Sequence, residues 1–129
     1  MPVSEALTKG VRVHVESRYS PEHSNPVVSK YFFLYTIRIS NEGDKTLQLQ
    51  SRHWIIADAE GHTEEVRGPG VVGKQPVLEP GGVFEYTSGC PLATPFGAMS
   101  GTYRMVTRDG ESFDAEIPSF ELTQPYGVH

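Results

Sequence analysis

The chain has little or none of several features that mark particular classes of protein. It contains one cysteine in 129 residues, which excludes an internal disulfide and any metal site built from several cysteines. No apolar run approaches the ~20 residues that cross a membrane, and residues 1–10 lack the basic start and apolar stretch of a secretory signal. The formal net charge is −5, whereas broad nucleic-acid binding depends on a basic surface. We therefore expect a cytoplasmic protein that contacts neither a membrane nor nucleic acid.

Helical periodicity is also missing, and period-two patterns take its place. Valines alternate with polar residues over 11–16, and aromatic and aliphatic residues alternate over 31–40. Such alternation is typical of half-buried strands. Further strands are expected over 46–58, 62–67 and 83–88, separated by glycine- and proline-rich turns.

This pattern of short strands predicts an all-β fold, a two-sheet antiparallel sandwich with one tryptophan on a central strand. Residues 1–129 are expected to form a single domain, without repeats. Residues 1–10 and 124–129 are expected to be loose ends.

The strand over 46–58 changes phase part-way along. Leu47 and Leu49 are apolar at odd positions, whereas Trp54 and Ile56 are apolar at even ones. One regular strand cannot bury both pairs, so a bulge or bend is predicted near residues 50–52.

The last strands are expected to form a hairpin around Asp109-Gly110, a dipeptide typical of a type I′ turn. Pro118 is predicted to end the second strand of this hairpin, because proline cannot donate to a strand ladder. Phe120 and Leu122 would then form a short separate strand.

Residues 66–76 nearly match two phosphate-binding motifs and satisfy neither. Gly68, Gly70 and Gly73 spell GxGxxG, and Gly68 to Lys74 spells GxxxxGK. Both motifs require a helix after the last glycine, and none is predicted here. The P-loop also requires Ser or Thr after the lysine, where this chain has glutamine.

Two interpretations of this glycine segment remain. Successive glycine N–H groups can form an anion-binding nest without a helix, supplemented by the charges of Lys74, Arg67 and Arg52. Three nearby glutamates balance those three cations, so no net field attracts an anion. Alternatively, the glycines allow a tight crossing between the two sheets. The candidate anion-binding residues are Gly68, Gly70, Gly73, Lys74 and Arg67.

No arrangement of residues points to catalysis, a metal or a cofactor. The five histidines do not pair at spacings typical of zinc sites. Cys90 has no histidine or basic neighbour in the sequence that would lower its pKa, so a buried, inert thiol is expected. We therefore expect a protein that is not an enzyme.

A second candidate surface is the turn-rich segment 94–101. Exposed loops on a rigid scaffold commonly carry recognition. In this segment Phe96 and Met99 are the apolar side chains expected to be exposed. The candidate protein-contact residues are Thr94, Pro95, Phe96 and Met99.

The chain resembles the ApaG family over nearly its whole length, including residues 31–41. The residues that carry the resemblance are Arg52-x-Trp54-x-Ile56-x-Asp58, Gly61, Val66-x-Gly68-x-Gly70-Val-Val-Gly73-x-Gln75-Pro76, Pro80-Gly81, Phe84-x-Tyr86-x-Ser88-Gly89, Leu92-x-Thr94-Pro95-x-Gly97-x-Met99-x-Gly101-x-Tyr103 and Ile117-Pro118-x-Phe120.

The resemblance implies an immunoglobulin-like or fibronectin type III-like sandwich. It also implies an association with cobalt tolerance and magnesium efflux, and a gene neighbourhood that includes a diadenosine tetraphosphate hydrolase. Related domains in eukaryotic F-box and polymerase-associated proteins suggest a binding or adaptor module.

Two functions are therefore carried forward. The first is a non-catalytic binding domain that contacts a protein partner. The second is a binder of a phosphate-bearing small molecule, pyrophosphate or a dinucleotide polyphosphate, at residues 68–76. An exposed strand edge could also pair two copies in a homodimer.

Overall fold

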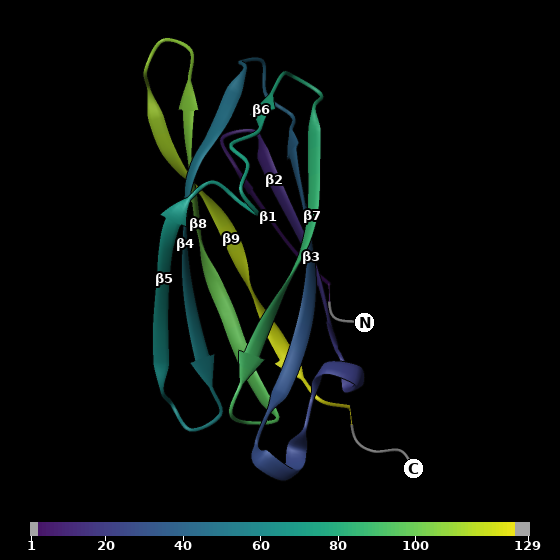
Figure 1. The fold of residues 1–129 in the computed structure, drawn as a ribbon. Helices are drawn as coiled ribbons and strands as arrows, with labels where there is room; N and C mark the ends of the chain where they lie inside the picture. Colours follow the sequence, from purple (N-terminus) through teal and green to yellow (C-terminus); the bar gives the residue numbers. More distant parts are fainter. Residues whose placement is uncertain (1–2, 126–129) are drawn as a thin grey trace.

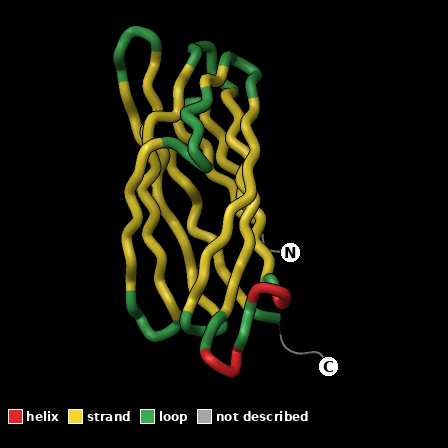
Figure 2. The backbone as a smooth tube through the Cα atoms, viewed as in Figure 1, coloured by secondary structure: helices red, strands yellow, loops and turns green. Residues whose placement is uncertain are grey.

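The protein is a sandwich of two antiparallel sheets, seen in a computed structural model that describes residues 3–125 (Figures 1 and 2). One sheet has the order β1-β2-β3-β7; the other has the order β5-β4-β8-β9, with the short β6 also paired to β4.

Two 3₁₀ turns, η1 and η2, lie between β2 and β3. The strands and turns are β1 Val3–Thr8, β2 Val11–Tyr19, η1 Pro21–His23, η2 Pro26–Val28, β3 Tyr31–Asn41, β4 Leu47–Asp58, β5 Thr63–Pro69, β6 Val77–Leu78, β7 Val83–Leu92, β8 Phe96–Thr107 and β9 Ser112–Thr123. The predicted all-β sandwich is confirmed. Within residues 3–125, no helix is long and apolar enough to cross a membrane.

The core lies between the sheets, where the alternating side chains of the strands meet. Val11, Val13 and Val15 of β2 are fully buried, as the period-two pattern predicted. Trp54 of β4 lies at the centre of an aromatic cluster, with ring centroids 5.4 Å from Tyr35 and 6.0 Å from Phe120. Edge-to-face packing of this kind adds about 0.5–1.5 kcal/mol per pair beyond area burial.

A buried hydroxyl pair also joins the two sheets. The Tyr86 hydroxyl of β7 lies 2.5 Å from the Tyr103 hydroxyl of β8. Burial raises the pKa of both phenols, so each stays neutral and can donate as well as accept. The pair satisfies two polar groups that would otherwise be costly in the core.

The predicted bulge in β4 is confirmed. The pairing of β4 with β8 shifts between Leu49 and Ser51, which leaves Gln50 as the extra residue. Because of this extra residue, Leu49 before the bulge and Trp54 after it both face the core. The same shift turns Arg52 toward the inner face.

The expectation of a loose N-terminal end is wrong for residues 3–8. They form β1, which pairs in register with β2 from Val3↔Glu16 to Thr8↔Val11. The inward side chains of β1 are small or polar, so its alternation is too weak to recognise in the sequence. At the other end, the Gln124 N–H donates to Pro95 O at 2.8 Å, so this residue is also held. Residues 1–2 and 126–129 of the expected loose ends lie outside the described residues.

The C-terminal hairpin exists, but two of its predicted details are wrong. Of the predicted turn dipeptide, only Gly110 has a positive φ, 90°, and the Thr107 N–H donates to Glu111 O at 2.8 Å. The connection is therefore a three-residue loop, which needs one left-handed residue where a type I′ turn needs two. The second strand, β9, also continues through Pro118 to Thr123, because a register shift opposite Met99–Gly101 places Pro118 in a bulge where no ladder donor is needed.

Arg12 of β2 ties the N-terminal strand to the turn after β3. Its guanidinium lies 3.1 Å from a Glu5 carboxylate oxygen and 2.6 Å from one of Glu42. His14 lies 2.9 Å from the other Glu5 oxygen. The hydrogen bond from His14, with that from Arg12, lowers the pKa of Glu5; the hydrogen bond from Arg12 lowers the pKa of Glu42.

We predict that replacing Arg12 destabilises the protein in a pH-dependent way. The lowered pKa values mean that both carboxylates add stability above the ordinary glutamate value of 4.5, and that this stability is lost as the pH falls through the folded values. Thermal melts should show a Tm gap between wild type and Arg12→Gln that is present near neutral pH and narrows below 4.5. Arg108→Gln, at an exposed arginine in the β8–β9 turn, is the control. A gap that stays constant between about pH 7 and about pH 3 would contradict this origin of the stability.

Candidate functional site

One interpretation of the glycine segment was that it crosses between the two sheets. The structure shows that it does not. The strands on either side of it, β5 and β6, both pair with β4. The segment 70–76 therefore leaves the edge of one sheet and rejoins the same edge, opposite the bulge at Gln50. The crossing interpretation is wrong because β4 is long enough, once bulged, to hold both flanking strands.

The segment is anchored to β4 by backbone and side-chain hydrogen bonds. The Gly70 N–H and the Gln75 side-chain amide both donate to Gln50 O, at 3.0 and 2.9 Å. The Leu49 N–H donates to Pro76 O at 3.0 Å. The carbonyl that the bulge exposes is thus used to hold the segment in place.

Between these anchors, residues 71–74 form a tight turn. Val71 and Lys74 exchange two backbone hydrogen bonds of 2.8 Å each, and Val71 is fully buried in the core. The two central residues, Val72 and Gly73, have φ values of 42° and 80°. Positive φ at both positions is the geometry of a type I′ turn.

Two of the other glycines have steric explanations. A Cβ at Gly68 would lie 3.1 Å from the Arg52 guanidinium, and a Cβ at Gly70 would lie 2.2 Å from Lys74 O. Gly68 therefore leaves room for the side chain of Arg52, which donates from Nη1 to Pro69 O and Gly70 O at 3.0 and 2.9 Å.

These contacts give the anion-nest interpretation no support. The N–H groups of Gly70, Val71 and Lys74 are all used within the protein. Arg67 lies in β5 and pairs with Glu65 at 3.2 Å, whereas Lys74 lies in the turn. The hydrogen bonds of these three N–H groups and the ion pair of Arg67 serve the fold.

The structure separates the candidate protein-contact residues into two groups. Phe96 is 53% exposed. Met99 and Thr94 are buried, so the expectation that Met99 is exposed is wrong. The reason is that strand β8 already begins at Phe96, which turns Met99 toward the core three residues later.

The Thr94 side chain holds the backbone of Phe96 in place. Its hydroxyl accepts the Ala59 N–H at 3.0 Å and donates to Phe96 O at 2.8 Å. Pro95 O accepts the Gln124 N–H from the end of the chain. The β7–β8 turn is therefore held on both sides and presents Phe96 in a fixed place.

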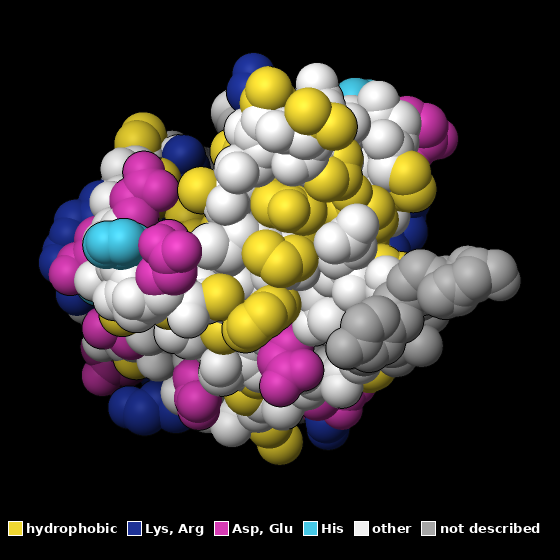
Figure 3. Space-filling view, turned by 90° about the horizontal axis from the view of Figure 1, so that it is seen from below, with side chains coloured by type: hydrophobic (Ala, Val, Ile, Leu, Met, Phe, Trp, Pro, Cys, Tyr) yellow, Lys and Arg dark blue, Asp and Glu magenta, His cyan; other side chains and the backbone are white. Residues whose placement is uncertain are grey.

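Phe96 and the turn η2 lie at the same end of the sandwich (Figure 1), and we call the apolar residues there the apolar end: Val27, Val28, Pro95 and Phe96. Val27 and Val28 of η2 are 92% and 57% exposed. Figure 3 shows hydrophobic side chains running in a band across this end of the sandwich. Val27 and Val28 were not identified from the sequence as candidate contact residues, because the segment around them is polar. Two adjacent valines after Pro26 were the signal that could have indicated them.

A shallow hollow of about 480 Å³ lies beside Phe96. Its walls are small, with Ala57, Ala59 and Ala98 among them, and Asp58 and Glu121 bring negative charge. The hollow could therefore take an apolar side chain next to a basic one.

A second cavity, which we call the intersheet cleft, opens between the sheets on the side of the edge strands β5 and β7. It has a volume of about 260 Å³. Tyr35, Ser88 and Cys90 line it from one sheet, and Arg52 and Trp54 from the other. Sequence reasoning gave Arg52 only a supporting part and missed this convergence, because the cleft exists only once the β4 bulge turns Arg52 inward.

Cys90 is buried, as expected. Burial raises the pKa of its thiol to about 11, and the charge of Glu64 adds to the rise. Burial likewise raises the pKa of Tyr35, against the opposing effects of a hydrogen bond with Ser88 and the charge of Arg52. Raised values keep both groups protonated at neutral pH.

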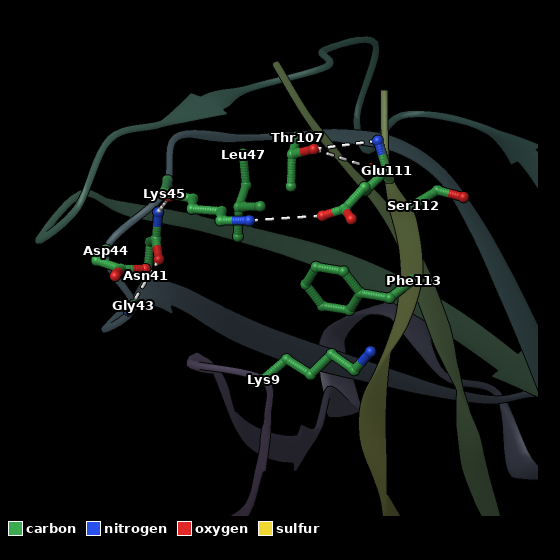
Figure 4. A pocket seen from close by; sticks show the side chains of 10 residues that line it. All are labelled: Lys9, Asn41, Gly43, Asp44, Lys45, Leu47, Thr107, Glu111, Ser112 and Phe113. Carbon is green, nitrogen blue, oxygen red and sulfur yellow. Dashed lines mark hydrogen bonds and ion pairs between the residues drawn. The ribbon is translucent and has the colours of Figure 1, made fainter. Parts of the chain in front are cut away.

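A third hollow, of about 470 Å³, lies at the opposite end of the sandwich among the turns after β1, β3 and β8. Figure 4 shows the Lys45 ammonium pointing across it to Glu111, at 3.5 Å. Lys9 lies over the Phe113 ring, 5.6 Å from its centroid. Both lysines of this hollow already contact groups of the protein, so the hollow is a less suitable site for an anion.

Three of the histidines, His14, His53 and His62, each lie beside a different carboxylate. His53 pairs with Glu65 and His62 with Asp58, at 2.8 and 3.3 Å, and His14 lies on the outer face of the other sheet. Among residues 3–125, no three His, Cys, Asp or Glu side chains lie close enough together to hold a metal ion.

We predict that Gly70→Ala destabilises far more than Gly61→Ala. Both glycines have positive φ, 61° and 86°, so both substitutions carry a backbone cost of about 1–2 kcal/mol. Only at Gly70 does the new Cβ also collide with a backbone carbonyl, which should add about 2 kcal/mol or more. Urea unfolding of the two variants measures the difference. Equal losses would show that the segment can relax.

We predict that Val72→Asn stabilises the protein. A β-branched residue at φ 42° is strained, whereas asparagine tolerates this region, and Asn-Gly is the preferred dipeptide of a type I′ turn. The expected gain is about 1 kcal/mol. Val83→Asn is the matched control, because Val83 is similarly exposed but lies in strand β7. A gain at Val83 as large as that at Val72 would mean that lost apolar exposure, not backbone strain, explains the effect.

Comparison with known proteins places this arrangement in a family. A family model described as the ApaG domain matches residues 21–107. Protein ApaG of Methylorubrum extorquens (strain PA1) is 58% identical over 122 residues, which are 95% of this chain and 94% of that protein. The crystal structure of a Bordetella pertussis protein described as ApaA is similar with a TM-score of 0.87 and 49% identity, covering 98% of each chain. The C-terminal domain of wzt, at 9% identity and a TM-score of 0.56, covers 98% of this chain and 80% of that one and shares the fold alone. The chain belongs to the ApaG family.

Proposed function

We propose that this protein is a non-catalytic binding domain that contacts a protein partner through the apolar end. The observation that carries the proposal is the exposure of Phe96, Val27 and Val28, which lie at one end of the sandwich (Figure 1). Clustered apolar exposure of this kind marks interaction surfaces in globular proteins.

The support of the turn adds to the argument. Hydrogen bonds at Thr94 and Pro95 hold the Phe96 backbone before any partner arrives. An aromatic side chain on a fixed backbone loses little conformational freedom on binding, which favours affinity.

The hollow beside Phe96 suggests the chemistry of the partner. Small alanine side chains line it together with Glu121 and Asp58. The Asp58 carboxylate already accepts the Glu60 and His62 N–H groups, so Glu121 is the carboxylate available to a partner. A partner segment with an apolar side chain next to a lysine or arginine fits this combination. In this proposal, the partner protein carries out the function behind the family's association with cobalt tolerance and magnesium efflux, and this domain only binds it.

We predict that Phe96→Asp combined with Val28→Asp removes partner binding without unfolding the domain. Both side chains are exposed, so the cost in stability should stay within about 0.5 kcal/mol per site. Quantitative pull-downs after cross-linking, with wild type and variants side by side, measure the loss. Val83→Asp combined with Val77→Asp is the matched control, because these exposed valines lie in β7 and β6, away from the apolar end. A double variant at the apolar end that keeps every partner of the wild type would refute the proposal.

A further inference from the structure

The intersheet cleft contains a half-buried arginine without a carboxylate partner. Arg12, Arg38, Arg67 and Arg104 each pair with an acidic side chain. Arg18, Arg52 and Arg108 form no ion pair in residues 3–125, and of these three only Arg52 is partly buried, because Arg18 and Arg108 are exposed. A partly buried cation is costly unless it is paired. The cleft therefore holds a charge whose natural complement is an anion.

The guanidinium of Arg52 is held in a fixed orientation. Its Nη1 donates to Pro69 O and Gly70 O, and the absence of a side chain at Gly68 lets the group lie flat against β5. Two carbonyl contacts fix the plane of the group but supply no negative charge. A fixed guanidinium loses little freedom when it binds a carboxylate through its remaining donors.

The rest of the lining suits the body of a small organic acid. Trp54 and Met99 give an apolar floor, and the hydroxyls of Tyr35 and Ser88 can complete the polar contacts. A volume of about 260 Å³ suits a ligand the size of one aromatic ring with its acid group. The carboxylate of Glu64 also lines the cleft, and its charge disfavours a polyanion.

We infer that the intersheet cleft is a binding site for a small monocarboxylate with an apolar or aromatic body, whose carboxylate pairs with Arg52 while its body packs on Trp54 and Met99. Pyrophosphate and nucleotide polyphosphates are disfavoured there by Glu64. The site uses different residues from the apolar end, so either can be tested without the other.

Trp54 makes the site directly measurable. It is the single tryptophan of the chain, it is 3% exposed, and it lines the cleft. Titration of the intact protein with phenylacetate should give a saturable change in tryptophan fluorescence, with a Kd of about 1 mM or tighter. Phenylacetamide, which has the same body and no charge, should bind at least about tenfold more weakly.

Two variants test separately how the charge of Arg52 and the shape of the cavity contribute to binding. Arg52→Gln should weaken phenylacetate binding at least about tenfold, whereas Arg67→Gln, on the neighbouring strand, should leave it unchanged. Because Arg52→Gln could also unfold the segment it anchors, Val66→Phe provides a second test, since it narrows the cleft and leaves Arg52 in place; it should also abolish binding. Circular dichroism checks the fold of each variant.

Three outcomes would overturn the inference. The first is no saturable change, together with unmoved NMR amide signals of Gly68 and Ser88, at about 20 mM phenylacetate. The second is equal affinity for phenylacetate and phenylacetamide, or a response that survives both Arg52→Gln and Val66→Phe. The third is tighter binding of pyrophosphate than of phenylacetate.

Discussion

The extra residue at Gln50 is the constraint on which most of this structure depends. Without it, β4 would bury Leu47 and Leu49 but turn Trp54 toward solvent, and the aromatic cluster could not form. The bulge also frees the Gln50 carbonyl, which holds both ends of the glycine segment. Finally, it turns Arg52 into the space between the sheets. One inserted residue thus determines the core, the loop and the cleft together.

Sequence reasoning succeeded where side-chain alternation was strong. The valines of β2 and the phase change in β4 were sufficient to predict two strands and a bulge. It failed where the determining contact is distant in the sequence. Strand β1 shows weak alternation and is stabilised by pairing with β2 and by the Glu116 N–H of β9, which donates to the Thr8 hydroxyl. Pro118 lies inside a strand because its partner strand tolerates a bulge there. Met99 looked like a loop residue because glycines surround it. Those glycines instead let β8 approach β4 closely, since a Cβ at Gly101 would lie 2.0 Å from His53 O.

The candidate sites illustrate the same limit. The glycine motif is visible in the sequence, yet its amides serve the fold. Phe96 could be predicted as exposed, whereas its neighbours at the apolar end come from η2, far away in the chain. The convergence of Arg52 with Tyr35 and Ser88 combines two sheets and could not be predicted from spacing. Binding surfaces of a sandwich arise from pairs of distant strands, which local patterns do not encode.

The glycine segment has a further consequence for how the molecule behaves in a crowded solution. A long free strand edge is a template for the strand of another molecule, and natural sheets commonly blunt such edges. Here the edge beyond β4 is cut in two: β5 has seven residues, and β6 has two. Between them the chain folds inward, with Val71 in the core. The segment therefore interrupts the edge of this sheet that flanks the bulge, and together with the charged side chains of β5, Glu64, Glu65 and Arg67, it limits edge-to-edge polymerisation.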